Sequence, residues 1–135
     1  IGIGYAIPID HAKPIIEDLI KFGRARYGTI GIQVAVRPGL LQIPQARQQY
    51  KQETGFDPPE NGALVITVDE TGTGKAAGID ILDVIVEVNG QKVEGRDDFI
   101  RETYGVRPGE KVRIKIFQRG KMNEKVLTAL DLTNL

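Results

Sequence analysis

The sequence lacks serine and cysteine altogether, and its 135 residues include a single histidine, His11. Neither a Ser-His-Asp nor a Cys-His catalytic arrangement can be assembled from such a chain, and a metal site with two histidine ligands is also excluded. The lack of cysteine removes disulfides and zinc–thiolate sites, although it does not fix the compartment. We therefore expect no catalytic residue, no metal and no cofactor, and we expect His11 to be solvated at the start of a helix.

The sequence also lacks an excess of charge of one sign. Lys and Arg together number 18, as do Asp and Glu, so nothing attracts the chain as a whole to nucleic acid or to an anionic membrane. No apolar run reaches the length of a membrane-spanning helix. Two acidic pairs, Asp69-Glu70 and Asp97-Asp98, are typical of a turn and of a helix N-terminus rather than of acid–base chemistry. We expect neither nucleic acid nor a membrane span.

What is present is a composition typical of one globular domain, with 41% hydrophobic and 27% charged residues. The chain opens on Ile1 with no signal-peptide pattern, which we interpret as a piece of a longer protein. Residues 1–8 predict a glycine-rich strand, and apolar residues at helical spacing predict a helix from about Pro14 to Gly23. A short basic connector, residues 24–28, follows and marks a functional boundary.

The most informative stretch runs from Arg26 to Val34. A basic, glycine-containing turn leads there directly into a β-branched strand, predicted over residues 29–36. Gly31 weakens the interior of such a strand unless another backbone must approach closely. Consecutive N–H groups in the turn could hold a carboxylate, and the strand beyond could pair with an incoming peptide. The alternative is that Gly31 marks a β-bulge in an ordinary strand.

The rest of the chain predicts an α+β fold, a small β sandwich or partly open barrel of five to six strands with two helices. The polar insert over residues 37–61 contains one short helix, and its Tyr50 and Phe56 are interpreted as anchors that pack a loop. Asn89-Gly90 predicts a hairpin turn, and Arg119-Gly120 predicts a second turn. The other predicted elements are strands over residues 62–68, 82–88, 91–93, 112–117 and 126–132, a helical turn over 75–78, and helices over 44–53 and 96–106.

Six short motifs occur in a specific order and spacing. They are Thr29-Ile30-Gly31-Ile32 (the x-Φ-G-Φ loop), Gly62-Ala63-Leu64-Val65, Ala77-Gly78-Ile79, Asp83-Val84-Ile85, Val88-Asn89-Gly90 and Arg107-Pro108-Gly109. With them, residues 28–132 resemble a bacterial-type PDZ domain, in which the peptide-binding strand comes first. Residues 1–23 resemble the last protease strand and the connecting helix of HtrA/Deg-type trypsin-like serine proteases. The sequence departs from the family at Leu82, where glycine is usual, in the longer insert over 37–61, and at Gly28-Thr29, where an aromatic residue is frequent.

The resemblance implies that extended polypeptides bind by strand addition, often through a free C-terminus. It implies that the amides of Ile30, Gly31 and Ile32 receive the carboxylate, with positive charge from Arg24 or Arg26. The groove would be lined by Thr29, Val34, Phe99, Thr103 and Val106. Because Ile100 and Tyr104 form a competing stripe on the same predicted helix, the helix face that lines the groove is left open.

The resemblance further implies a division into residues 1–23, the end of a protease domain with its connecting helix, and residues 24–135, the PDZ domain. The partners would be peptide or unfolded-protein C-termini and the upstream protease domain, with homo-oligomers in the parent enzyme. The location would be extracytoplasmic or periplasmic. An alternative function is an assembly or scaffolding module that mediates oligomer contacts.

Overall fold

The computed structural model describes residues 13, 16–17, 19–20 and 27–132. The predicted strand over residues 1–8 lies outside the described residues, as do Arg24 and Arg26. Within the predicted helix from Pro14 to Gly23, residues 16–17 and 19–20 are described and are helical.

The described core is an antiparallel sheet with the strand order β2-β3-β4-β6-β7, in which β5 pairs with β4. A second sheet joins β1 to β8. The strands are β1 (Gly28–Thr29), β2 (Ile32–Val34), β3 (Ala63–Val68), β4 (Val84–Val88), β5 (Gln91–Lys92), β6 (Lys111–Gln118), β7 (Lys121–Thr128) and β8 (Leu130–Asp131). The helices are η1 (Leu40–Gln42), α2 (Pro44–Thr54), α3 (Thr73–Ala76) and α4 (Arg96–Thr103). The predicted PDZ-like α+β class is confirmed, and the sheet is not closed into a barrel.

The strand predicted over residues 29–36 is two short strands instead. Gly31 has a φ of +72°, a left-handed conformation that a β-strand cannot continue through, and it separates β1 from β2. The register shift with β3 lies further on, between Gln33 and Val34. The extra residue at this irregularity is Ile66 of β3, so the irregularity does not lie at Gly31.

Left-handed residues also set other boundaries. Asn89 and Gly90 have φ values of +50° and +80°, which matches the predicted two-residue hairpin turn. Arg119 and Gly120 repeat this pattern, so β7 begins at Lys121 rather than at residue 126. Leu82 has a φ of +72°, and β4 accordingly begins at Val84 rather than at residue 82. The predicted helix over residues 96–106 ends earlier, at Thr103.

Two hydrophobic clusters hold the sheet. The larger one joins the inner face of the sheet to α4 through Phe99. The smaller one joins Leu41 and Tyr50 of the insert to Val84 on β4. Each large apolar side chain buried in this way contributes about 1.5–3 kcal/mol. The fully buried side chains of the larger cluster include Val65, Ile85, Val88, Val112, Ile114 and Ile116.

The insert over residues 37–61 is packed rather than open. The Arg47 guanidinium donates to the carbonyl oxygens of Leu41 (2.8 Å), Pro58 (2.8 Å) and Pro59 (3.1 Å). The Tyr50 hydroxyl donates to Leu82 O (3.0 Å). Burial raises the pKa of Tyr50, and the nearby carboxylate of Asp83 raises it further.

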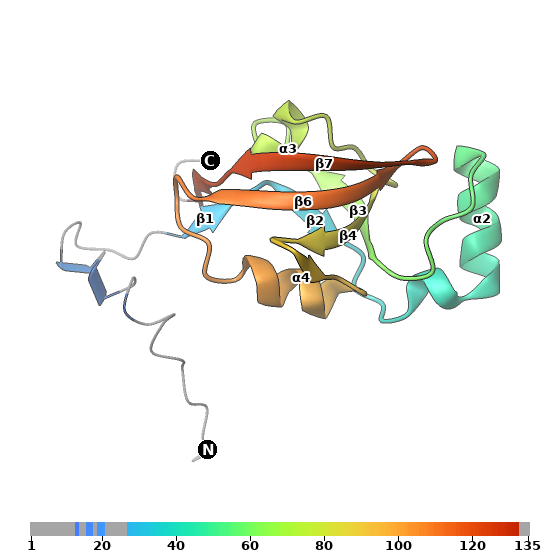
Figure 1. Ribbon diagram of the computed structural model, residues 1–135, viewed down its shortest axis with the longest axis horizontal. Coiled ribbons are helices and arrows are strands. Elements are labelled where there is room, and N and C mark those ends of the chain that lie inside the picture. Colours follow the sequence, from blue (N-terminus) through green and yellow to red (C-terminus); the bar gives the residue numbers. More distant parts are fainter. Residues whose placement is uncertain (1–12, 14–15, 18, 21–26, 133–135) are drawn as a thin grey trace, which may run out of the picture.

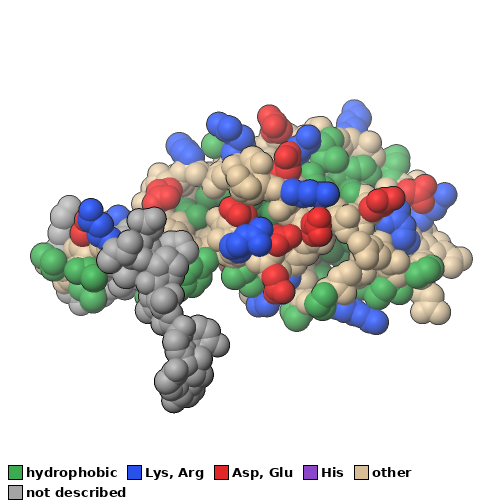
Figure 2. All heavy atoms as spheres, turned by 60° about the horizontal axis from the view of Figure 1, so that its bottom comes forward, with side chains coloured by type: hydrophobic (Ala, Val, Ile, Leu, Met, Phe, Trp, Pro, Cys, Tyr) green, Lys and Arg blue, Asp and Glu red, His purple; other side chains and the backbone are tan. Residues whose placement is uncertain are grey.

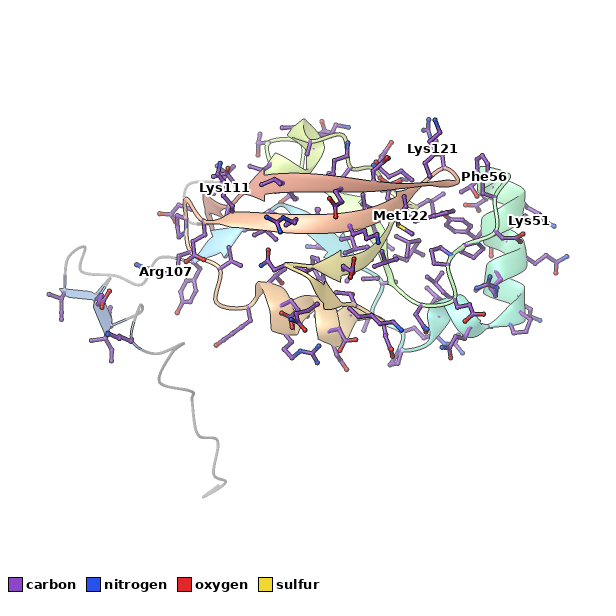
Figure 3. All side chains as sticks on the ribbon, viewed as in Figure 1. Lys51, Phe56, Arg107, Lys111, Lys121 and Met122 are labelled. Carbon is purple, nitrogen blue, oxygen red and sulfur yellow. The ribbon has the colours of Figure 1, made fainter. Side chains whose placement is uncertain are left out.

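Phe56 is the second anchor of the insert. Its ring lies against Gly120, where an added Cβ would come within 2.8 Å of the ring, and Figure 3 shows it beside the tip of the β6–β7 hairpin. Tyr50 is 5% exposed and Phe56 is 42% exposed, so Tyr50 is the deeper anchor. The insert helix α2 lies at the end of the molecule opposite β1 (Figure 1). The insert therefore stiffens the fold far from the β1 end.

Candidate functional site

The outer edge of β2 is open to a further strand. In the part of the chain that the structure describes, β2 is the end strand of the larger sheet and pairs with β3 alone. The Asp69 N–H donates to Gly31 O (2.8 Å), so the carbonyl of Gly31 and, by alternation, the backbone groups of Gln33 face β3. The backbone N–H of Ile32 consequently points to the open edge.

The loop between β1 and β2 is fixed from behind. The Gly74 N–H donates to Ile30 O (2.9 Å), and the Asp69 N–H donates to Gly31 O. In a trans peptide the N–H points opposite to the preceding carbonyl, so the two N–H groups that follow, those of Gly31 and Ile32, both face away from this support. Two consecutive amides directed to one side are the geometry that holds an anion.

Close packing holds this support in place. A Cβ added at Gly31 would lie 3.0 Å from the Cα of Gly72, and one added at Gly74 would lie 2.7 Å from Cγ1 of Ile32. For residues 69–78 the sequence predicts only a turn at Asp69-Glu70 and a helical turn over 75–78, with no role in the site. The spacing of Gly72 and Gly74 was the available signal, because glycine permits a close approach of backbones.

Thr29 interacts directly with the loop amides. Its Oγ1 accepts a hydrogen bond from the Gly31 N–H (3.0 Å), closing a turn of two residues. The Thr29 backbone pairs with Leu130 of β8, and the Gly28 N–H donates to Val106 O (2.8 Å). The strand that carries Thr29 is therefore held on both of its edges.

A pocket of about 90 Å³ lies next to these amides. Apolar side chains and polar groups line it in about equal measure, and it opens between the β1–β2 loop and α4. Phe99 and Val112 line it and are almost completely buried, so the pocket reaches the hydrophobic core. An engineered cavity of about 150 Å³ holds benzene, so this pocket suits a smaller group such as one aliphatic side chain. Its lining residues are Gly28, Thr29, Ile30, Ile32, Phe99, Thr103, Val106 and Val112.

Most of the residues predicted for the site line this pocket, namely Thr29, Ile30, Ile32, Phe99, Thr103 and Val106. Gly28 and Val112 also line it and were not predicted. Val34 does not line the pocket, because its side chain is buried in the core. Arg26 lies outside the described residues. On α4 the pocket is lined by Phe99 and Thr103, whereas the competing residues Ile100 and Tyr104 are 37% and 60% exposed.

A second hollow, of about 220 Å³, lies at the other end of α4. It is lined by Val36 and Pro38, which follow β2, and by Arg96 and Asp97 in the first turn of α4. The two hollows thus lie at opposite ends of the space between β2 and α4.

Acidic and basic side chains are mixed on the molecular face seen in Figure 2. The mixture leaves this face without a strong charge of one sign.

Arg107 brings positive charge to the β1 end of the molecule (Figure 3). Arg107 directly follows Val106, whose carbonyl accepts from Gly28, and Figure 3 shows it at the β1 end of the molecule. The sequence identifies it only as part of the motif Arg107-Pro108-Gly109, with no predicted role in binding. Within residues 27–132 and the few described before them, no group of His, Cys, Asp and Glu is arranged to hold a metal ion. In the same residues, no helix has the length and apolar character needed to cross a membrane.

Comparison with known proteins gives related sequences. The Probable periplasmic serine endoprotease DegP-like of Brucella suis biovar 1 (strain 1330) is 31% identical over 134 residues, which cover 99% of this chain and 24% of the relative. The Serine protease HtrA-like of Staphylococcus haemolyticus (strain JCSC1435) is 32% identical over 124 residues, which cover 91% of this chain and 19% of the relative. The chain spans about a quarter of these relatives or less.

Solved structures show the same fold. The HtrA-type protease AlgW with decapeptide superposes with a TM-score of 0.67 at 21% identity, covering 93% of this chain and 36% of that one. The serine endoprotease from Yersinia pestis superposes with a TM-score of 0.62 at 26% identity, covering 97% of this chain and 39% of that one. The family model described as PDZ domain matches residues 28–130, which contain both β1 and the pocket. This chain belongs to the PDZ domain family.

Proposed function

We propose that this chain is a peptide-binding module that holds an extended polypeptide by its C-terminal carboxylate. The polypeptide adds a strand to the open edge of β2, its carboxylate meets the amides of the β1–β2 loop, and its last side chain enters the pocket. The observation that carries this proposal is the position of the pocket beside the outward Ile32 N–H and the Thr29 hydroxyl, which the Gly31 N–H holds in place, in a loop whose carbonyls are fixed from behind. The second hollow supports it, because an extended ligand along β2 reaches that end of α4.

The interactions set the scale of the affinity. A hydrogen bond to a carboxylate contributes about 1.5–3 kcal/mol, and strand-pairing bonds contribute about 0.5–1.5 kcal/mol each. Burying one apolar side chain adds about 1.5–3 kcal/mol. Association costs an estimated ~4–15 kcal/mol. Because the favourable and unfavourable contributions are of similar size, we expect moderate affinity, with dissociation constants at about the micromolar level, which suits reversible selection of ligands.

We further propose that the parent protein is an HtrA/Deg-type serine endopeptidase and that this module regulates it or delivers substrate to it. The sequences that match nearly the whole chain belong to proteins named as serine endoproteases, and the DegP-like relatives are named periplasmic. In this proposal residues 1–23 end the protease part, residues 24–135 form the module, and the protein works outside the cytoplasm. The catalytic serine would belong to the parent, because this chain contains none.

Fluorescence polarisation of the 135-residue chain with a labelled peptide tests the binding proposal. The peptide carries a free carboxylate and a C-terminal valine, and its matched control is the same peptide with an amidated C-terminus. We expect the free acid to bind at about the micromolar level and the amide at least tenfold more weakly. Equal affinities for both peptides would contradict carboxylate capture, and no binding of either would contradict the module itself.

A second candidate function is assembly into oligomers. The end strand β7 carries Met122 and Val126, which are 48% and 60% exposed, on an edge without a neighbour in the described sheet. Lys121 and Lys125 lie on the same strand and disfavour edge-to-edge pairing. Light scattering tests this function: a mass that rises with concentration in the native chain but not in Val126→Lys supports it, and a constant monomer mass rejects it.

A further inference from the structure

Thr29 has a position in the site that the groove-lining role does not explain. Its Oγ1 lies 3.0 Å from the Gly31 nitrogen, on the side toward which the fixed amide points. A carboxylate oxygen from a ligand cannot occupy the same place. Either the hydroxyl leaves when a ligand arrives, or it stays and becomes part of the site.

The surroundings of Thr29 favour the second outcome. Its backbone is held by pairing with Leu130, and the neighbouring Gly28 N–H is bound to Val106 O. Rotation about χ1 is restricted in a β-branched side chain. The Gly31 N–H cannot turn to follow the ligand either, because the carbonyls on both sides of it are bound by Gly74 and Asp69. A ligand could therefore bind the Gly31 N–H only after the Thr29 side chain had changed its rotamer.

The Thr29 hydroxyl still has a proton to donate. Among the hydrogen bonds of residues 27–132, its oxygen serves as an acceptor for Gly31. A hydroxyl has one donor in addition to its lone pairs, and Thr29 lines the pocket. A hydroxyl that accepts a hydrogen bond is polarised and becomes a better donor.

We infer that the Thr29 hydroxyl binds the carboxylate directly and takes the place that the Gly31 amide would otherwise have in the site. This inference rests on the proposed function. In the complex the Gly31 N–H donates to Thr29 Oγ1, and the Thr29 O–H donates to one carboxylate oxygen. The Ile32 N–H donates to the carboxylate as well. The site is then made of a hydroxyl and a main-chain amide.

Two variants of the 135-residue chain test this inference with the free-acid peptide and its amide. Thr29→Val keeps the shape and the β-branching but removes the hydroxyl, and Thr29→Ser keeps the hydroxyl. We expect Thr29→Val to weaken free-acid binding roughly 10- to 100-fold, as expected for one hydrogen bond to a charged group, and to leave amide binding nearly unchanged. We expect Thr29→Ser to retain free-acid binding within about threefold.

Two results distinguish this inference from the proposed function. If the native chain prefers the free acid but Thr29→Val binds it equally or more tightly, the hydroxyl is a spectator or an obstacle and the inference is overturned. If the native chain binds neither peptide, the proposed function fails and the inference fails with it. Should Thr29→Val not fold, proton exchange of the Thr29 hydroxyl in the native chain decides: slowing by the free acid but not by the amide supports the inference, and unchanged exchange overturns it.

Discussion

Replacing Gly31 by alanine separates the two interpretations of this glycine, a close backbone approach and an ordinary strand irregularity. At φ +72° an L-residue costs about 1–2 kcal/mol from its Cβ alone. The new Cβ would also lie 3.0 Å from Gly72 Cα and 3.3 Å from Asp69 Cβ. Overpacking of this kind costs about 1–3 kcal/mol further, because both neighbours belong to the support behind the loop.

Gly55→Ala is the matched control. Gly55 has a φ of +82° at the end of α2, and an added Cβ would meet nothing within 4 Å. The backbone strain and the smaller entropy of the unfolded chain are therefore common to both variants. We expect the free energy of unfolding, measured with urea, to fall by about 1–3 kcal/mol more in Gly31→Ala than in Gly55→Ala.

Peptide affinity should separate the variants as well. Pushing the loop off Gly72 tilts the amides of Gly31 and Ile32, so we expect Gly31→Ala to bind the free-acid peptide at least about tenfold more weakly. Gly55→Ala should bind like the native chain, because Gly55 lies at the opposite end of the molecule. The reasoning is refuted if the two variants lose equal stability and bind the peptide equally.

Three further predictions concern other parts of the molecule. Burial raises the pKa of Tyr50 above its value of 10.0 in the unfolded chain, so the contribution of Tyr50 to stability is full below pH 10 and is lost as the pH rises through the folded pKa. The unfolding free energy should therefore fall more steeply above about pH 10 in the native chain than in Tyr50→Phe. Exposed Tyr104→Phe is the control, and a parallel decline in the native chain and Tyr50→Phe would contradict the prediction. Arg47→Met removes a charged hydrogen-bond donor from three backbone carbonyls. It should therefore lower the unfolding free energy, measured with urea, by about 2 kcal/mol and make residues 37–61 more susceptible to limited proteolysis. Unchanged cleavage would show that the insert does not need Arg47. Because the pocket is about 90 Å³, calorimetry should show tighter binding of a peptide ending in valine than of one ending in tryptophan, and the reverse order would mean that the pocket is not the one that receives the last side chain.

The sequence predicted the fold class and most elements because local signals agreed with tertiary packing. Asn89-Gly90 formed its hairpin, and β6 alternates buried and exposed side chains as its pattern indicated. The errors occurred where a single left-handed residue decided a boundary. Leu82 is not glycine, so its positive φ leaves no local signal in the sequence, whereas the turn at Arg119-Gly120 was predicted and only the strand after it was placed too late.

The candidate site was predictable in its residue types and not in its construction. The sequence could place Ile30, Gly31 and Ile32 in one loop from spacing alone. It could not show that backbone groups of Asp69 and Gly74 fix this loop from behind, since such contacts join segments some 40 residues apart and involve no side chain. The choice between Phe99 and Ile100 on α4 also needed the sheet, because both stripes are apolar and only packing distinguishes them.

Leu82 and the insert over residues 37–61, two of the places where the resemblance implied a departure from the usual pattern, are in contact. Leu82 adopts the left-handed conformation that glycine usually supplies, and the insert residue Tyr50 donates to its carbonyl while Leu82 packs into the smaller cluster. A strained backbone persists only where its surroundings determine it fully. The insert is one such surrounding.

The pairing of β1 with β8 has a mechanical consequence. The Leu132 N–H donates to Tyr27 O (2.8 Å), and only two residues separate Tyr27 from Ile30. A span of two residues cannot lengthen to absorb a displacement. A force that pulls on the chain before Tyr27 would therefore act on the hydrogen bonds between β1 and β8, and then directly on the loop whose amides face the pocket.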